Sequence, residues 1–399
     1  MIKRERFLAP IRPFYDVTDL VKVIVGIRRA GKSVLLSQIA DEIRQSGVDD
    51  RHIVMINFEL FDYFAIKTAA DLDKFITSQI DKNGTFYVFF DEIQNVSGFE
   101  LVVNSLRSLG NVSVFITGSN AHLLSGDLAT HLSGRYVQFL VTPLTFVEVM
   151  DITGGTDHKS TFENFMKWGG LPGRFNFKGE TETAKYLQDV YDSIVLRDIV
   201  QRSGLRDLNL LDNIIQFLLD NIGSIFSANT VSKYLKSQSR SVSPETLYNY
   251  IDYILKSLLF SKVDRYDIKG KSVFSTLEKY YVADLGILQL KRTGANVNLG
   301  GKLENIVAQE LIARGYRINV GVLRNAEIDF VAEKENGSRL YVQVAYTIDS
   351  DATLEREIGA FNSIGDHYEK ILLTTDTADH SQNGVRHVNV VDWLVNQSN

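Results

Sequence analysis

The sequence predicts an α/β fold that begins with a parallel sheet covered by helices on both faces. Up to about residue 150, short apolar runs alternate with stretches of helical periodicity, which is the pattern of such sheets. One of these runs is followed by a glycine-bearing loop, and another ends in two acidic residues. The expected strands are 21–25, 53–58, 86–90, 112–117 and 136–141.

The loop after the first strand matches the phosphate-binding pattern G-x-x-x-x-G-K-[ST], and a helical stretch follows it. Its glycines let backbone N–H groups close around phosphate oxygens, and the helix N-terminus adds partial positive charge. The sequence therefore predicts a P-loop NTPase fold that binds a nucleoside triphosphate. Lys32 would reach the β- and γ-phosphates, and the Ser33 hydroxyl would bind Mg²⁺. The expected binding residues are Gly26, Ile27, Arg28, Arg29, Ala30, Gly31, Lys32, Ser33 and Val34.

Arg28 and Arg29 are unusually bulky and charged for such a loop. They would contact phosphate or a partner, or simply face solvent, and the sequence does not decide between these alternatives.

The apolar run 86–90 leads directly into Asp91 and Glu92, with a strand and a helix between it and the P-loop. An apolar strand that ends in paired acids is the Walker B arrangement. Asp91 would hold the Mg²⁺ shell, and Glu92 would polarise the attacking water as the catalytic base.

Two further candidates follow the fourth strand, which ends in Thr117-Gly118-Ser119-Asn120. A small polar side chain at this tip, with Asn120 as the candidate, would contact the γ-phosphate or the water. Ser119 or Asn120 would serve equally well as the N-cap of a helix expected at 121–133, and the choice among the three polar residues stays open. Arg135 would project into a neighbouring subunit's nucleotide as an arginine finger, or form a local ion pair.

Composition limits the classes of protein to which the chain can belong. It has a net charge of −6, 44% apolar residues and no cysteine, so disulfides, thiolate metal sites and a global basic field for nucleic acid are excluded. The sequence has neither an apolar run long enough to span a bilayer nor a signal-peptide core. We therefore expect a cytoplasmic protein, with domains at 1–150, 151–290 and 291–399.

The second domain, 151–290, is expected to hold a helical lid and a winged helix-turn-helix. Helices are predicted at 162–174, 183–201, 206–221, 228–237 and from 244, with a hairpin over 260–275 as the wing. Arg197 would reach the nucleotide or pair with Asp198. The helix in the DNA-reading position is nearly neutral, and the basic residues lie elsewhere, at Lys233, Lys236, Arg240, Arg265, Lys269 and Lys271. DNA contact and docking of a partner remain alternatives.

The third domain, 291–399, has an αββ…αβ pattern. The pattern consists of a helix at 301–314, strands at 316–323, 327–332 and 340–346, a helix near 353–365 and a strand at 371–375. Glu304, Asp329 and Gln343 fall where a metal-dependent nuclease would carry its acids, and Ala345 falls at the lysine position. An amide neutralises no metal charge and a methyl group donates nothing, so we expect this nuclease-like site to be inactive.

Together these motifs resemble the bacterial and archaeal AAA-type ATPases whose P-loop domain precedes a carboxy-terminal domain of unknown function. The matching segments include GIRRAGKS, VFFDEIQN, FITGSN, LSGR, PLTFVEV, WGGLPGRF, DSIVLRDIV, RYDIKGK, KYYVADLG, GKLENIVAQEL and EIDFVAE. The resemblance implies an AAA+ ATPase core, a winged-helix segment and a tail similar to the PD-(D/E)xK nuclease fold. It also implies ATP, rather than GTP, as the nucleotide.

The sequence thus predicts a Mg²⁺-dependent ATPase that couples nucleotide state to conformational change or to binding of DNA or an unidentified protein client. An arginine finger acting in trans would require a homo-oligomer. One alternative is a nucleotide-gated binding module with little turnover. The other is an ATP-driven nuclease, which Gln343 and Ala345 disfavour.

Overall fold

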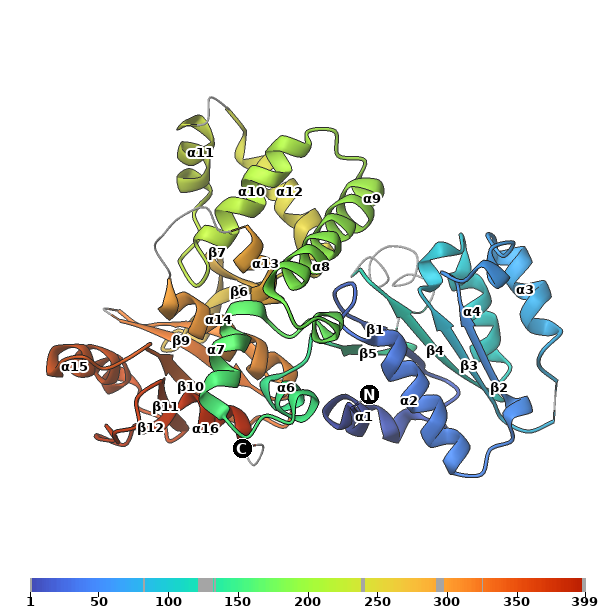
Figure 1. The fold of residues 1–399 in the computed structure, drawn as a ribbon, viewed down its shortest axis with the longest axis horizontal. Helices are drawn as coiled ribbons and strands as arrows, with labels where there is room; N and C mark the ends of the chain where they lie inside the picture. The colour runs from blue at the N-terminus through green and yellow to red at the C-terminus, as the bar shows by residue number, and fades with distance from the viewer. Residues whose placement is uncertain are drawn as a thin grey trace. The chain divides into compact units, whose positions relative to one another are not determined.

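The structure, a computed structural model, describes residues 2–81, 83–120, 132, 134–237, 241–291, 298–324 and 326–396. The chain divides into two compact units. The first is Met1–Thr142 with Lys256–Leu258, and the second is Pro143–Leu255 with Leu259–Asn399. Each unit is built around its own sheet (Figure 1).

Within its described residues, the first unit contains a five-stranded sheet in the order β2-β3-β4-β1-β5, with every pair of neighbours parallel. Its strands are β1 (Val21–Val25), β2 (Ile53–Asn57), β3 (Phe86–Asp91), β4 (Val112–Gly118) and β5 (Tyr136–Leu140). Its helices are α1 (Glu5–Ile11), α2 (Lys32–Gln45), α3 (Ala69–Thr77) and α4 (Phe99–Ser108). The predicted strands and the parallel α/β fold are therefore confirmed, with bounds that differ by one residue at most.

The sheet of the first unit carries helices on both faces (Figure 1). Alternate strand residues such as Val23, Val88 and Val114 share one apolar cluster with side chains of α3 and α4. Phe115 points to the opposite face, where Tyr15, which follows α1, packs edge-on against its ring at a centroid distance of 6.1 Å. Because every pair of neighbouring strands is parallel, the carboxyl ends of all five strands meet at one edge, which is where such sheets bind a ligand.

The second unit holds a mixed sheet that, among the described residues, has seven strands in the order β12-β11-β10-β9-β8-β6-β7. The strands are β6 (Phe260–Asp267), β7 (Ser272–Val282), β8 (Arg317–Val322), β9 (Glu327–Glu333), β10 (Arg339–Val344), β11 (Glu369–Thr374) and β12 (Arg386–Asn389). The hairpin that we expected as a wing is longer than predicted and is part of this sheet, because β6 pairs in parallel with β8. The predicted domain boundary at residue 290 therefore falls inside one sheet.

Helices make up the rest of the second unit. They are α6 (Phe146–Thr153), α7 (His158–Trp168), α8 (Glu180–Ser193), α9 (Gln201–Ser203), α10 (Leu208–Asp220), α11 (Ala228–Ser237), α12 (Pro244–Lys256), α13 (Leu285–Leu290), α14 (Leu299–Ala313), α15 (Asp351–Gly359) and α16 (Val390–Val395). The helix expected at 183–201 is interrupted by a π-helix, Ile194–Val200, in which Arg197 is exposed and Asp198 is buried. Asp198 lies 4.0 Å from Arg202, one turn further on.

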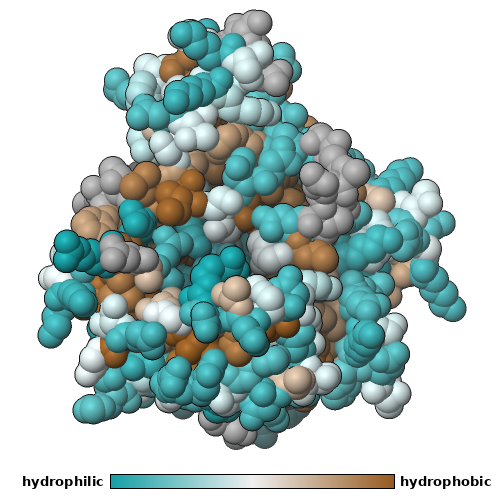
Figure 2. All heavy atoms as spheres, turned by 90° about the vertical axis from the view of Figure 1, so that its left-hand side faces the viewer, coloured by the Kyte–Doolittle hydropathy of each residue, from teal (hydrophilic) through white to brown (hydrophobic). Residues whose placement is uncertain are grey.

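The surface is chemically mixed. On the face drawn in Figure 2, hydrophobic side chains occur in several separate places between hydrophilic ones. Exposed apolar side chains are normal on soluble proteins, so we attach no binding role to these places. Among the described residues, none of the helices has both the length and the apolar character needed to cross a bilayer.

Candidate functional site

The loop between β1 and α2 needs glycine at two positions. A Cβ atom on Gly26 would lie 2.2 Å from the carbonyl oxygen of Val141, which is far too close. Gly31 has a φ of +98°, in the left-handed region that side chains disfavour. Both glycines of the predicted phosphate-binding pattern thus follow from the backbone itself.

Lys32, the first residue of α2, folds its side chain back over this loop. Its ammonium donates to the carbonyl oxygens of Gly26 at 3.0 Å and Ile27 at 3.4 Å. It also lies 3.5 Å from the Glu92 carboxylate, and the Lys32 side chain is only 3% exposed. The Lys32 ammonium is therefore held by neutral carbonyl oxygens and by one carboxylate 3.5 Å away. An incoming anion can replace these weak partners.

Asp91 ends β3 and connects the predicted motifs. Its carboxylate accepts hydrogen bonds from Thr117 Oγ1 at 2.6 Å and Asn57 Nδ2 at 3.0 Å, and from the Ser33 hydroxyl. Burial raises the pKa of Asp91, and the two hydroxyl hydrogen bonds oppose that rise. The P-loop serine and the strand-end acid that were expected to share Mg²⁺ thus lie in direct contact. A hydroxyl next to a carboxylate is a donor set that suits this ion.

Glu92 has a backbone conformation that is rare for its residue type. Its φ of 55° and ψ of 45° lie in the left-handed region, and its N–H donates to Thr117 Oγ1 at 2.9 Å. Burial acts to raise the pKa of Glu92, but the charges of Lys32 and Arg28 outweigh it and hold the pKa below its usual value. The carboxylate is therefore ionised at neutral pH, as a base must be. Strain of this kind is concentrated at functional sites.

The two arginines of the loop have different surroundings. Arg28 is half-buried, and its Nη1 donates to Glu59 Oε1 at 3.1 Å. Arg29 is exposed and has a φ of 68°. Both arginines stay candidates for contact with phosphate or a partner.

Two contributors to this site were not predicted from the sequence. Asn57, at the end of β2, holds Asp91. Arg4, just before α1, is 2% exposed and donates to the carbonyl oxygens of Ala30 at 2.8 Å and Thr142 at 3.1 Å. The amino-terminal segment therefore braces the P-loop from outside the motif.

The tip of β4 lies between the P-loop strand and the acidic strand, as the strand order requires. Thr117 touches both Asp91 and Glu92 there, while Ser119 and Asn120 are fully buried just beyond the strand. Thr117 therefore contacts both acids, and Asn120 stays a candidate. The helix expected at 121–133 falls almost entirely outside the described residues. Arg240, one of the basic candidates for DNA contact, also lies outside them.

Arg135 lies far from this site within one chain. Its carbonyl oxygen accepts a hydrogen bond from Val21 N, at the start of β1, and its side chain is exposed. The P-loop follows the other end of β1, about 16 Å away at ~3.3 Å per residue. Within one chain, the structure does not bring Arg135 together with the other predicted site residues.

A second buried charge cluster lies in the second unit, around Lys279 of β7. Its ammonium contacts Glu304 Oε1 at 2.9 Å, Glu327 Oε1 at 3.0 Å and Asp329 Oδ1 at 3.2 Å. Burial raises the pKa of both Glu304 and Asp329, and the lysine opposes the rise. Two members of the predicted nuclease-like set thus meet, but they do so on a lysine that the sequence analysis did not identify.

The third member, Gln343, joins the cluster through its amide. It accepts from Asp329 N at 3.2 Å and donates to Glu357 Oε2 at 2.8 Å. Asp329 also accepts from Val344 N at 3.0 Å, and Tyr281 donates to Glu304 at 2.5 Å. No group of three or more His, Cys, Asp or Glu side chains in the described parts of the chain is arranged to hold a metal ion. Glu304 and Asp329 each accept from Lys279 and from a second protein donor.

Two family models match the chain. An AAA domain matches residues 18–150, and a domain of unknown function, DUF8612, matches residues 159–296. The first match covers the P-loop, Asp91 and Glu92.

Relatives extend over the whole chain. An uncharacterized protein of Haemophilus influenzae is 39% identical over 402 residues and covers 99% of each chain. An uncharacterized protein of Methanocaldococcus jannaschii is 31% identical over 361 residues, 86% of this chain and 78% of the relative. Among solved structures, the Walker-type ATPase of Pyrococcus abyssi is similar in fold, with a TM-score of 0.52 and 17% identity over 73% of this chain and 96% of that one.

Proposed function

We propose that this chain, which belongs to one family with these bacterial and archaeal relatives and matches an AAA domain over residues 18–150, binds Mg²⁺·ATP and hydrolyses the nucleotide. The observation that carries this proposal is the direct contact of Ser33 and Thr117 with Asp91, beside the Lys32–Glu92 pair. This arrangement brings together a phosphate-binding cation, a metal-binding oxygen pair and an ionised base at one sheet edge.

Each residue has a distinct role in this proposal. Lys32 and the loop amides hold the phosphates, and Ser33 and Asp91 hold Mg²⁺, which supplies charge neutralisation on the phosphate oxygens. Glu92 accepts the proton of the attacking water. Its left-handed backbone and its hydrogen bond to Gln94 Nε2, at 2.5 Å, fix the direction of the carboxylate. Thr117 aligns both acids.

The test is the variant Glu92→Gln. The amide preserves size and hydrogen bonding but cannot take a proton, so turnover should fall by about two orders of magnitude or more. ATP affinity should change little, because the phosphates are bound by other groups. Released phosphate measures turnover, and a fluorescent ATP analogue measures binding. Glu100→Gln, at a half-buried position on α4, is the control and should behave like wild type. Near-normal turnover in Glu92→Gln would remove this residue from the mechanism.

We propose further that Arg135 acts as an arginine finger. Because it lies at the edge of its own sheet opposite to the P-loop, it would have to reach the nucleotide of a second copy, so turnover would require a homo-oligomer. Specific activity should then rise with protein concentration in wild type. The Arg135→Ala variant should lose this rise, while Arg51→Ala, at an exposed arginine just before β2, should keep it. Specific activity that does not vary with concentration would contradict a shared site.

DNA remains a candidate partner in this proposal. Lys233 and Lys236 of α11 and Lys269 and Lys271 of the β6–β7 turn are exposed, as phosphate-binding side chains must be. DNA should stimulate turnover, and this stimulation should weaken as salt rises. An unstimulated, very slow turnover with tight nucleotide binding would favour the nucleotide-gated binding module instead.

We propose that the Lys279 cluster is structural and does not cleave nucleic acid. The ammonium occupies the space between the acids where a nuclease would need a divalent ion. Cleavage of linear, nicked or single-stranded DNA with Mg²⁺ or Mn²⁺ should be absent. Robust cutting that is lost in Asp329→Ala would reverse this interpretation.

A further inference from the structure

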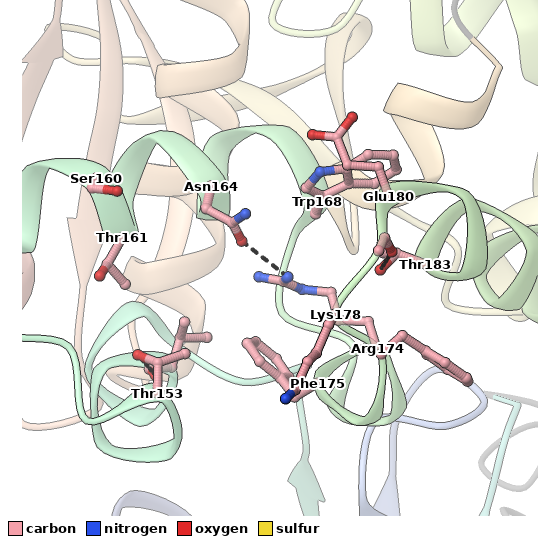
Figure 3. A pocket seen from close by; sticks show the side chains of 13 residues that line it. Thr153, Ser160, Thr161, Asn164, Trp168, Arg174, Phe175, Lys178, Glu180 and Thr183 are labelled. Carbon is pink, nitrogen blue, oxygen red and sulfur yellow. Dashed lines mark hydrogen bonds between the residues drawn. The ribbon is translucent and has the colours of Figure 1, made fainter.

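A cavity of about 360 Å³ opens in the second unit, among α6, α7, the short 3₁₀ helix Pro172–Asn176 and α8. This volume is in the range of sites for small ligands. Figure 3 shows its lining: Ser160, Thr161 and Asn164 come from α7, Thr183 comes from α8, and Arg174 reaches between them. All these residues belong to one unit, and none takes part in the P-loop site.

Arg174 is the unusual member of this lining. The residue is 6% exposed, its Nε donates to Gly169 O at 2.8 Å, and its Nη1 donates to Asn164 Oδ1 at 3.0 Å. Its Nη2 is buried and has no hydrogen-bond partner among the described residues. Buried guanidinium groups are normally paired, because an unsatisfied charged donor is costly. Its Cζ lies 4.0 Å from the centroid of the Phe175 ring, so the guanidinium rests on an aromatic face and keeps one unsatisfied donor at the wall of this cavity.

The charge around Arg174 indicates the kind of ligand. Burial lowers the pKa of Arg174 to about 10, and the charge of Asp284 opposes this only in part. The group thus remains cationic at neutral pH, and no carboxylate among the described residues forms an ion pair with it. Lys178 adds a second cation to the lining, while Glu180 at the rim is paired with Lys167 at 2.5 Å. Two cations and two hydroxyls, on Ser160 and Thr161, suit a compact dianion with several oxygens.

We propose that this cavity binds a phosphate group, as free phosphate or as a small phosphate monoester, with Arg174 as the buried anchor. At neutral pH a phosphate monoester carries nearly two negative charges and three acceptor oxygens, which match the two cations and the hydroxyls. The proposal is independent of nucleotide hydrolysis, because it uses none of the P-loop residues.

The test is calorimetric titration of the full chain with inorganic phosphate at constant ionic strength. The P-loop would bind phosphate as well, so wild type is compared with Lys32→Ala and with Arg174→Gln. Binding at the cavity should persist in Lys32→Ala and weaken about tenfold or more in Arg174→Gln, because a hydrogen bond to a charged group is lost. Equal affinity in wild type and folded Arg174→Gln would overturn the proposal, as would loss of all binding in Lys32→Ala.

Two further variants separate ligand binding from folding. Arg174 is buried, so Arg174→Gln must show the circular dichroism spectrum and the cooperative unfolding of wild type before its result counts. Lys178 is exposed, and Lys178→Ala should weaken phosphate binding severalfold without changing the unfolding temperature. The exposed Lys185→Ala of α8 lies outside the lining and should leave the affinity unchanged. If Arg174→Gln does not fold, an unchanged affinity in Lys178→Ala would count against the proposal.

Parallel titrations identify the source of the phosphate group. Glycerol phosphate that binds more tightly than inorganic phosphate would assign the cavity to a monoester, and the reverse order would assign it to the free ion. Acetate should bind more weakly than either. Acetate that binds as tightly as phosphate would overturn the assignment to a dianion.

Discussion

The two units each hold a buried lysine against acidic side chains, but the pairing differs. In the first unit, Lys32 leans on the carbonyl oxygens of its own loop and lies 3.5 Å from its acid. In the second unit, Lys279 contacts three carboxylates within 3.2 Å. The cation of the first unit is therefore available to an incoming anion, and the cation of the second is not.

The neighbours of the two lysines extend this difference. Ser33, beside Lys32, is exposed, and the backbone around it is strained at Glu92. Around Lys279, a tyrosine hydroxyl donates to Glu304 and a backbone N–H donates to the Asp329 carboxylate, while the Gln343 amide oxygen accepts from the Asp329 N–H. We therefore expect Lys32, with one acid at 3.5 Å, to serve nucleotide binding, and Lys279, with three acids within 3.2 Å, to serve folding. Three substitutions test this distinction.

The largest effect is expected from Lys279→Met. Removal of the ammonium leaves Glu304, Glu327 and Asp329 close together without their cation, and breaking such a buried pair costs about 3–5 kcal/mol. The free energy of unfolding, from denaturant titration of the second unit, should fall by that amount. Arg386→Met removes the exposed pair with Glu369 in the same sheet and should cost less than about 1 kcal/mol. Similar losses in both variants would mean that the cluster does not stabilise the fold.

An intermediate effect is expected from Lys32→Ala, and it should fall on nucleotide affinity instead of stability. Nucleotide affinity should fall about 10- to 100-fold, because charge-assisted bonds to phosphate are lost. Stability should change much less than in Lys279→Met, because water can reach the freed carbonyl oxygens beside exposed Ser33. Titration with the ATP analogue and denaturation of the same sample measure the two quantities. If Lys32→Ala unfolds easily and still binds nucleotide, the distinction fails.

The smallest effect is expected from Thr117→Val, which removes the hydroxyl between the two acids. The hydroxyl's hydrogen bond lowers the pKa of Asp91, so its loss should raise that pKa further. A carboxyl with a higher pKa takes up its proton at higher pH, so Mg²⁺-dependent ATP binding should fail earlier on acidification. The midpoint, measured by titration from neutral to acidic pH, should move upward. Thr117→Ser, which keeps the hydroxyl, should leave it in place.

The fold of the first unit could be predicted because its signals are local. Five apolar runs gave five strands, and Gly26, Gly31 and Asp91 are recognisable from their immediate neighbours. Phosphate loops of this kind depend on short-range backbone geometry, which the glycines encode. The carboxyl-edge position of the strand-end residues then followed from parallel topology.

The residues that the sequence did not reveal act through partners far away in the chain. Arg4 binds the carbonyl of Thr142, and Lys279 binds Asp329 across β7 and β9. A lysine within the apolar stretch around Tyr280 and Tyr281 indicates that a buried acidic partner exists. The sequence does not indicate which acid that partner is. Long-range pairing also separates the hairpin 260–275 from a wing, because only its register with β8 shows that it belongs to the sheet.

That register matters for any attempt to study the parts of this chain separately. The second family model ends at residue 296, after β7 and before β8. A fragment cut there would keep the β6–β7 hairpin and lose its parallel neighbour, leaving a row of unpaired N–H and C=O groups along β6. Exposed rows of this kind recruit strands from other molecules, so such a fragment should aggregate when expressed. A soluble fragment of the second unit should instead extend from residue 143 to the end of the chain.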